Sequence, residues 1–386
     1  MSSRNKFKFL LLLVALSSTL LSAPARARGQ EPPDTSRQRP RTVEQTPPKS
    51  PTKPTLQRSA EDKEAKPPDG DVLRVDTNLV NVFFTAVDKN KRFVTTLGQD
   101  DVRVKEDGAT QEVFTFQRET ERPLSIAILI DVSASQQHTL PVEKTAAQTF
   151  VDTVIRPRKD QVAVISFTGD ATLEQGFTST PELLKRAIEH VEVVFPPGYI
   201  GGGVVVTGVP SATDPDQLRA GSTAIWDAVW VTAEDLLSET SSKARRTIIL
   251  LTDGVDTSSQ FKRAEAIERA VKADTVVYSV GIGDKKNFEG VDKDTLRKLS
   301  ERTGGRAFFP REESELRAAF AQIEQELRSQ YLIAYSPTNK NHDGTYRKVE
   351  IEVVNPELRK QKLLLKYRQG YFAQTNTVAS DGSRNK

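Results

Sequence analysis

Between Leu124 and Arg328, short and nearly continuous runs of Val, Ile and Leu alternate with longer segments that have the period of an amphipathic helix. The apolar runs include SIAILID, QVAVISF, TIILLTD and TVVYSVGIG. Strands that are apolar on both faces and alternate with helices are typical of a parallel sheet covered on both sides. The pattern therefore predicts a doubly wound, mostly parallel α/β domain over residues 124–328, with helices at 141–155, 181–194, 223–238, 262–273, 293–302 and 313–328.

The segments on either side of this domain have β character. Residues 72–120 hold β-branched and aromatic residues in near alternation, with Asp107-Gly108 as a hairpin turn, and residues 329–373 hold further short strands between turn residues. Neither flank has enough strands to enclose a core, whereas together they supply roughly seven, enough for one sandwich. We expect an all-β sandwich-like domain built by both flanks, with the α/β domain inserted in it. Two separate β lobes are the alternative.

Both ends of the chain differ from the globular part. Residues 1–27 combine basic residues, an apolar run and small residues at cleavage positions, which indicates a secretory signal peptide; an uncleaved anchor is the alternative. Residues 28–71 are rich in Pro, Gln, Thr and mixed charge and predict a disordered tether, and residues 374–386 predict a disordered tail. A second long apolar run does not follow. We therefore expect an exported protein, periplasmic or extracellular, without a transmembrane span after signal cleavage.

The composition restricts the chemistry. The chain has no Cys, and its three histidines (His138, His190 and His342) are scattered. Disulfide scaffolds, thiolate metal sites and Cys nucleophiles are thereby excluded, so a bound metal would need mainly oxygen ligands, as Mg²⁺, Mn²⁺ and Ca²⁺ do. Lys+Arg 55 against Asp+Glu 52 leaves a net charge of +3, which is too balanced to indicate binding of nucleic acid.

Oxygen-bearing side chains follow the strands at the edge of the sheet where open α/β folds bind ligands. The motif Asp-Val-Ser-Ala-Ser places Asp131, Ser133 and Ser135 in one turn after a strand, Thr223 begins a helix, and Asp253 ends another strand. Two carboxylates balance Mg²⁺, and hydroxyls add neutral donors, so an octahedral ion would keep a position for an outside ligand such as a partner's Glu or Asp carboxylate. If no ion binds, these residues only end strands and cap helices.

The motifs DVSAS, GSTAIWDA and LLTDG, in this order, resemble the metal-ion-dependent adhesion site of von Willebrand factor A domains. The resemblance covers about 124–310 and implies five metal ligands: Asp131, Ser133, Ser135, Thr223 and Asp253. With the export signal, the Pro-rich segment and the C-terminal YLIAYSP and YRQGYFA motifs, the chain resembles exported bacterial von Willebrand factor A-related proteins. The long loop between Phe195 and Ala220 departs from the family pattern, and the sequence leaves its role open.

These observations predict a non-enzymatic protein-binding or adhesion module that captures an acidic residue of a partner through a divalent ion, Mg²⁺ first. The alternatives are a structural component of the cell envelope that needs no metal and, third, a metal-dependent hydrolase. The hydrolase lacks an evident general base, and no nucleophile-elbow motif surrounds Ser135 near His138. We interpret Asp256 as a loop residue or helix cap, and Trp226 and Trp230 as helix-to-sheet packing. The oligomeric state stays undefined.

Overall fold

The computed structural model describes residues 79–195, 199–201, 204–205, 222–283 and 290–375. The expected signal peptide at 1–27, the tether at 28–71 and most of the tail at 374–386 lie outside these ranges, as does most of the loop before Thr223. Of that loop, the paired strands β8 (Tyr199–Gly201) and β9 (Val204–Val205) are described. Within the described ranges, no helix has both the length and the apolar character needed to cross a bilayer.

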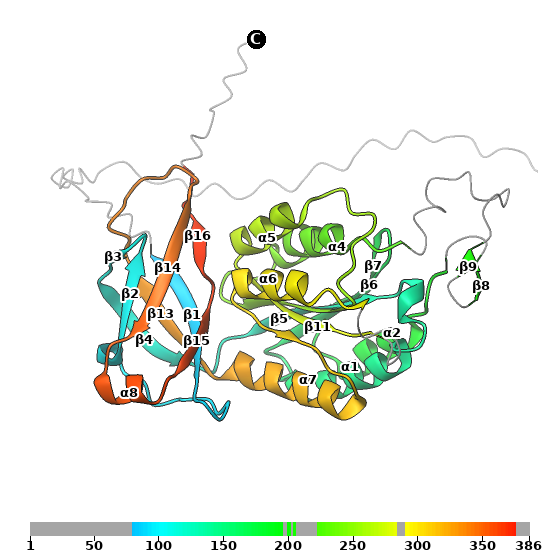
Figure 1. Cartoon of the computed structure of the whole chain (residues 1–386), viewed down its shortest axis with the longest axis horizontal. Coiled ribbons are helices and arrows are strands. Elements are labelled where there is room, and N and C mark those ends of the chain that lie inside the picture. The colour runs from blue at the N-terminus through cyan, green and yellow to red at the C-terminus, as the bar shows by residue number, and fades with distance from the viewer. Residues whose placement is uncertain (1–78, 196–198, 202–203, 206–221, 284–289, 376–386) are drawn as a thin grey trace, which may run out of the picture. The chain divides into compact units, whose positions relative to one another are not determined.

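A six-stranded sheet forms the centre of the α/β domain (Figure 1), in the order β12-β11-β10-β5-β6-β7. From β12 to β6 the neighbouring strands are parallel, which confirms the predicted mostly parallel sheet, and the edge strand β7 is antiparallel to β6. The sequence did not indicate β7, because its residues are exposed or half-buried and form no apolar run. The strands are β5 (Leu124–Asp131), β6 (Gln161–Phe167), β7 (Ala171–Thr178), β10 (Arg245–Thr252), β11 (Thr275–Gly281) and β12 (Ala307–Phe308).

Helices cover both faces of this sheet because its central strands are apolar on both sides. In β5, Ile126 and Ile128 pack on the side of α1, α2 and α7, whereas Ala127 and Leu129 pack on the side of α4, α5 and α6 (Figure 1). The observed bounds agree with the predicted ones to within a few residues, and the helix predicted at 181–194 ends earlier. The helices are α1 (Leu140–Val154), α2 (Pro181–His190), α4 (Ile225–Val231) with its π-helical continuation η4 (Thr232–Leu237), α5 (Arg263–Lys272), α6 (Lys293–Thr303) and α7 (Glu313–Arg328).

The two flanks share two four-stranded sheets, ordered β15-β1-β13-β4 and β16-β14-β2-β3. Strand β1, before the α/β domain, lies between β13 and β15, which follow it, and β14 pairs with β2 in the second sheet. Val82, Phe84 and Ile333 of the first sheet share one core with Val104 and Val349 of the second. The elements are β1 (Val80–Val87), η1 (Gln99–Asp101), β2 (Val102–Glu106), β3 (Ala109–Thr110), β4 (Val113–Glu119), β13 (Gln330–Tyr335), β14 (Tyr346–Val353), α8 (Pro356–Lys360), β15 (Leu364–Tyr367) and β16 (Gly370–Phe372).

The predicted hairpin turn joins β2 to β3. Glu106 pairs with Ala109, and the two residues between them, Asp107 and Gly108, have φ values of 48° and 86°. Positive φ at both central residues is the requirement of the tight hairpin turn that Asp-Gly favours.

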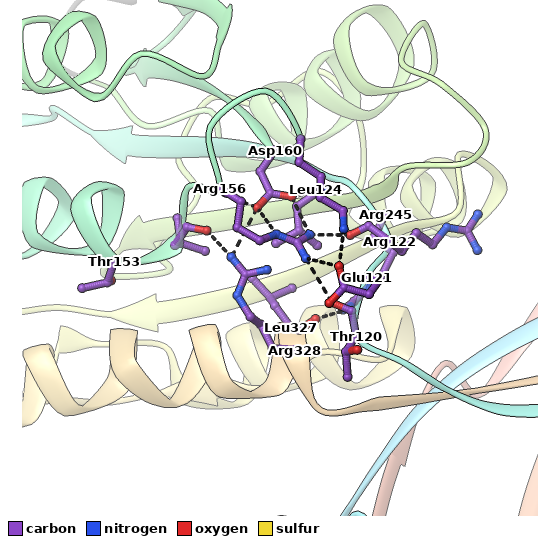
Figure 2. A network of polar contacts seen from close by, with 12 residues as sticks. Thr120, Glu121, Arg122, Leu124, Thr153, Arg156, Asp160, Arg245, Leu327 and Arg328 are labelled. Carbon is purple, nitrogen blue, oxygen red and sulfur yellow. Dashed lines mark hydrogen bonds and ion pairs between the residues drawn. The ribbon is translucent and has the colours of Figure 1, made fainter.

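Asp160 anchors the chain where it enters the α/β domain (Figure 2). Its buried carboxylate accepts hydrogen bonds from the Leu124 amide at the start of β5 (2.9 Å) and from Nε of Arg156 (2.8 Å). Arg156 also donates to the carbonyl oxygen of Arg122 (2.7 Å), and Arg328 at the end of α7 lies 3.3 Å from the same carboxylate. Burial alone would raise the pKa of Asp160, but hydrogen bonds from Arg156 and Leu124 hold it below its usual value. The network thus joins the segment that enters the α/β domain before β5 to the segment that leaves it after α7.

Candidate metal centre

Asp131 and Asp253 lie at the same edge of the sheet, because β5 and β10 are parallel neighbours and Asp131 ends the first while Asp253 follows the second. After Asp131 the chain turns through η2 (Ala134–Gln136), a short 3-10 helix. This turn brings the hydroxyl oxygens of Ser133 and Ser135 to 3.0 Å from one another. The Asp-Val-Ser-Ala-Ser spacing therefore places a carboxylate and two hydroxyls together, as the sequence predicted for one turn.

The Asp131 carboxylate is fully buried and held from both strands. Its Oδ1 accepts a hydrogen bond from the Ser133 amide (3.0 Å), and its Oδ2 accepts one from the Thr252 hydroxyl (2.6 Å). The Thr252 hydroxyl also accepts a hydrogen bond from the Gly254 amide (3.1 Å). Gly254 has a φ of 86°, and a Cβ there would lie 2.9 Å from Cγ of Leu296, so the turn after Asp253 requires glycine.

Gln136 joins the two halves of the site. Its Nε2 donates to the Ser135 hydroxyl (3.2 Å) and to Oδ2 of Asp253 (3.3 Å), while its Oε1 accepts a hydrogen bond from the Thr139 hydroxyl (2.8 Å). The side chain is 1% exposed. The sequence does not single out Gln136, because it shows only a polar residue directly after Ser135 and nothing local indicates that this residue is buried and turned toward Asp253.

Thr223 is buried and is fixed through its backbone to the loop that leaves Asp253. Its amide donates to the Thr257 hydroxyl (2.8 Å), and its carbonyl accepts hydrogen bonds from the amides of Thr257 (2.8 Å) and Ser258 (3.1 Å). Among the described residues, no hydrogen bond links its side chain to Asp131, Ser133, Ser135 or Asp253. Hydrogen bonds thus connect four of the five predicted ligands and place the fifth, Thr223, beside the loop that follows Asp253.

The remaining residues named in the sequence analysis make contacts that stabilise the fold. Asp256 accepts a hydrogen bond from the Ile225 amide (2.8 Å) and so caps α4, in line with its interpretation as a loop or cap residue. Trp226 lies in the core between α4 and the sheet, and Trp230 stacks on Phe261 with ring centroids 4.5 Å apart. Within the described residues, the hydroxyl of Ser135 is bonded to Ser133 and Gln136, and His138 is not among its partners.

The two carboxylates of the site differ in exposure, because Asp131 is fully buried and Asp253 is only partly buried. Burial raises the pKa of Asp131 to about 7, and the charge of Asp253 contributes to this rise. Burial also raises the pKa of Asp253, against the lowering effect of hydrogen bonds from Val255 and Ser135. In the described part of the chain neither carboxylate forms an ion pair, so an ion of positive charge would relieve the repulsion between them.

The donors fit a hard cation. Among the described residues, no group of three or more His, Cys, Asp or Glu side chains lies close enough to hold a metal ion. The donors that do meet are carboxylate and hydroxyl oxygens, which suit Mg²⁺, Mn²⁺ or Ca²⁺ better than a soft metal. A shallow groove of ≈ 520 Å³ begins at Gly254, the residue after Asp253; Trp226, Val255, Asp256 and Arg263 are among its lining residues, and Val255 is 43% exposed.

Comparison with known proteins places the matching region on the α/β domain. Two sequence models of the von Willebrand factor type A domain match, one over residues 126–255 and the other over residues 209–322. A curated relative, an uncharacterized protein from Borreliella burgdorferi, is 20% identical over 266 residues, which cover 63% of this chain. The alignment spans 65% of that protein, a little under two thirds of its length.

Similar solved structures have low sequence identity. The conserved hypothetical protein BatB from Bacteroides thetaiotaomicron is 19% identical, with 53% of this chain and 100% of that chain covered and a TM-score of 0.40. A von Willebrand factor type A protein from Catenulispora acidiphila is 13% identical, with coverages of 73% and 76% and a TM-score of 0.39. Proximal thread matrix protein 1 from the mussel byssus, with a zinc-occupied MIDAS motif, is 17% identical, with coverages of 54% and 49% and a TM-score of 0.38.

Proposed function

The chain belongs to the von Willebrand factor type A domain proteins through residues 126–322, and from this premise we propose that it is a non-enzymatic protein-binding module that depends on a divalent cation. The cation is Mg²⁺, with Mn²⁺ or Ca²⁺ as alternatives. The partner is a protein that offers a Glu or Asp carboxylate. The residues that hold the cation are Asp131, Ser133, Ser135, Thr223 and Asp253.

One observation carries this proposal: two carboxylates and two hydroxyls from the ends of adjacent strands are linked to one another, and no basic side chain in the described residues neutralises them. Buried carboxylates without a counter-charge cost free energy unless a cation is present. If these residues only ended their strands, there would be no reason for the Asp131 carboxylate to be buried near a second carboxylate, Asp253. The electrostatics therefore support a cation site over a purely structural turn.

Each residue of the site has its own role in binding the cation. Asp131 and Asp253 supply the negative charge, Ser133 and Ser135 supply neutral donors, and Gln136 holds Ser135 and Asp253 in place. A divalent cation bound there would attract a carboxylate from outside and coordinate it at an open position. The groove lined by Gly254 and Val255 would contact the partner's residues next to that carboxylate, so specificity for the partner would reside in its lining.

We also propose that the protein is exported, on the basis of residues 1–27. The destination is the periplasm or the cell exterior. Partner capture would then take place where Mg²⁺ and Ca²⁺ are available in free form.

The test is calorimetric titration of the purified protein with Mg²⁺, compared between the wild type and Asp131→Ala, followed by capture of partners from an envelope extract in Mg²⁺ and in EDTA. We expect Asp131→Ala to abolish both Mg²⁺ binding and the Mg²⁺-dependent capture while the protein stays folded. Asp152→Ala is the matched control, because it removes a half-exposed carboxylate of α1 that forms a surface ion pair with Lys185.

Unchanged Mg²⁺ affinity in Asp131→Ala would refute the cation site. Capture that persists in EDTA would instead favour the structural role without metal. Turnover of a phosphoester or peptide library that depends on Asp131 would favour the hydrolase.

A further inference from the structure

Glu143 is a buried carboxylate without an ion-pair partner among the described residues. It lies in the first turn of α1, is 0% exposed, and neither of its side-chain oxygens has a hydrogen-bond partner among the described residues. An ionised carboxylate in such a place is costly unless a positive charge compensates it. Its position therefore needs an explanation that the helix itself does not provide.

The other buried acidic residues show the usual solution. Glu106 pairs with Arg347 (3.4 Å), Asp160 with Arg156 (2.8 Å) and Glu326 with Arg306 (2.7 Å). Within the described residues, the buried acidic residues that form no ion pair are Asp131 and Glu143. Asp131 already belongs to the candidate metal centre, so a cation bound there would supply a positive charge for Glu143 as well.

Short links connect Glu143 to the centre. Its amide donates to the carbonyl of Thr139 (3.0 Å), the Thr139 hydroxyl donates to Gln136 (2.8 Å), and Gln136 donates to Asp253 (3.3 Å). Burial raises the pKa of Glu143 to about 8, the Thr139 side chain lowers it in part, and the charges of Asp131 and Asp253 raise it further. The three carboxylates are thus within electrostatic range of one another.

We propose that Glu143 is a positioning residue of the cation site. Its carboxylate stabilises the bound cation from the interior of the domain, and it is not a direct ligand beside the two aspartates. The absence of any close group of three acidic side chains in the described residues is the reason for an indirect role. Groups behind the direct ligands commonly change metal affinity by about 10–100-fold. This inference rests on the proposed function, because it requires that a cation binds at Asp131 and Asp253.

The experiment compares Mg²⁺ affinity, by calorimetry, and thermal unfolding in EDTA and in Mg²⁺ for the wild type, Glu143→Gln, Glu143→Asp and Glu326→Gln. We expect Glu143→Gln to bind Mg²⁺ about 10–100-fold more weakly, yet to unfold in EDTA at a temperature no lower than the wild type. Glu143→Asp, which keeps the charge, should retain more affinity than Glu143→Gln. Glu326→Gln removes a buried carboxylate that is paired with Arg306, so it should lower stability in both buffers and leave Mg²⁺ affinity unchanged.

A weaker Mg²⁺ affinity without a loss of stability in EDTA is the result that a purely structural glutamate would not give. Mg²⁺ affinity of Glu143→Gln equal to that of the wild type would overturn the role of Glu143 alone. Loss of stability in EDTA would overturn it too, because the side chain would then be a core residue with favourable contacts. A wild-type protein that binds no Mg²⁺ would instead overturn the proposed function, and this inference with it.

Discussion

Without divalent cations, the α/β domain should lose stability as the pH rises from about 4 to about 8. The folded protein holds Asp131 with a pKa of about 7 against 3.8 for the free group, and Glu143 with a pKa of about 8 against 4.5. Between the lower and the higher value the folded state binds more protons than the unfolded state, so stability falls with rising pH. It is fully present below the lower value and lost once the pH passes the higher one.

The magnitude follows from the two values for Asp131. Each pH unit between them corresponds to about 1.4 kcal/mol, so a rise from 3.8 to about 7 amounts to about 4 kcal/mol of lost stability. Glu143 adds to this, but its charge and that of Asp131 repel one another, so the two effects overlap and cannot simply be summed. Asp160 acts in the opposite sense: its pKa is lowered, so its contribution is lost only when the pH falls through values below 3.8.

The assay is urea unfolding in EDTA at several pH values from 5 to 8, followed by tryptophan fluorescence. Both tryptophans of the chain, Trp226 and Trp230, lie in α4, so the signal reports the α/β domain. We expect the midpoint to fall by about 1–2 M urea across this range, and Mg²⁺ at the upper end to restore it. Asp131→Asn should give a flatter profile, because its side chain does not ionise.

A midpoint in EDTA that stays level or rises from pH 5 to 8 would refute the reasoning. It would mean that water or an unseen positive charge already compensates the buried carboxylates.

Two further substitutions test the contacts around the site and at the entry to the domain. Gln136→Ala should weaken Mg²⁺ binding by about tenfold in calorimetry, because Ser135 and Asp253 lose the amide that orients them; an unchanged affinity would show that the amide is dispensable. Asp160→Asn should lower the free energy of unfolding by about 2–4 kcal/mol in urea, since it leaves Arg156 without its buried counter-charge. Because the Arg156 side chain is 26% exposed, we place this effect below that of a fully buried pair, and a change under about 1 kcal/mol would contradict the account.

The architecture could be predicted from the sequence because it depends on local patterns. The alternation of apolar strands with helices fixed the parallel sheet and the helix bounds, since a strand buried on both faces has to be apolar throughout. The Asp-Gly pair at 107–108 marked its hairpin for a similar reason, because few residues tolerate positive φ at both positions. Strand β7 escaped this reasoning because an edge strand with exposed faces carries no such pattern.

The candidate site, too, could be predicted only in part. The sequence by itself determined which residues follow each strand end, and parallel strands must bring those ends to one edge, so Asp131, Ser133, Ser135 and Asp253 could be grouped in advance. Only the tertiary structure decided that Gln136 joins Ser135 to Asp253, that Asp256 caps α4, and that Glu143 is buried without a counter-charge in the described part of the chain. Such contacts join residues far apart in the chain, and whether a polar side chain is satisfied depends on what the fold packs around it, which local periodicity does not encode.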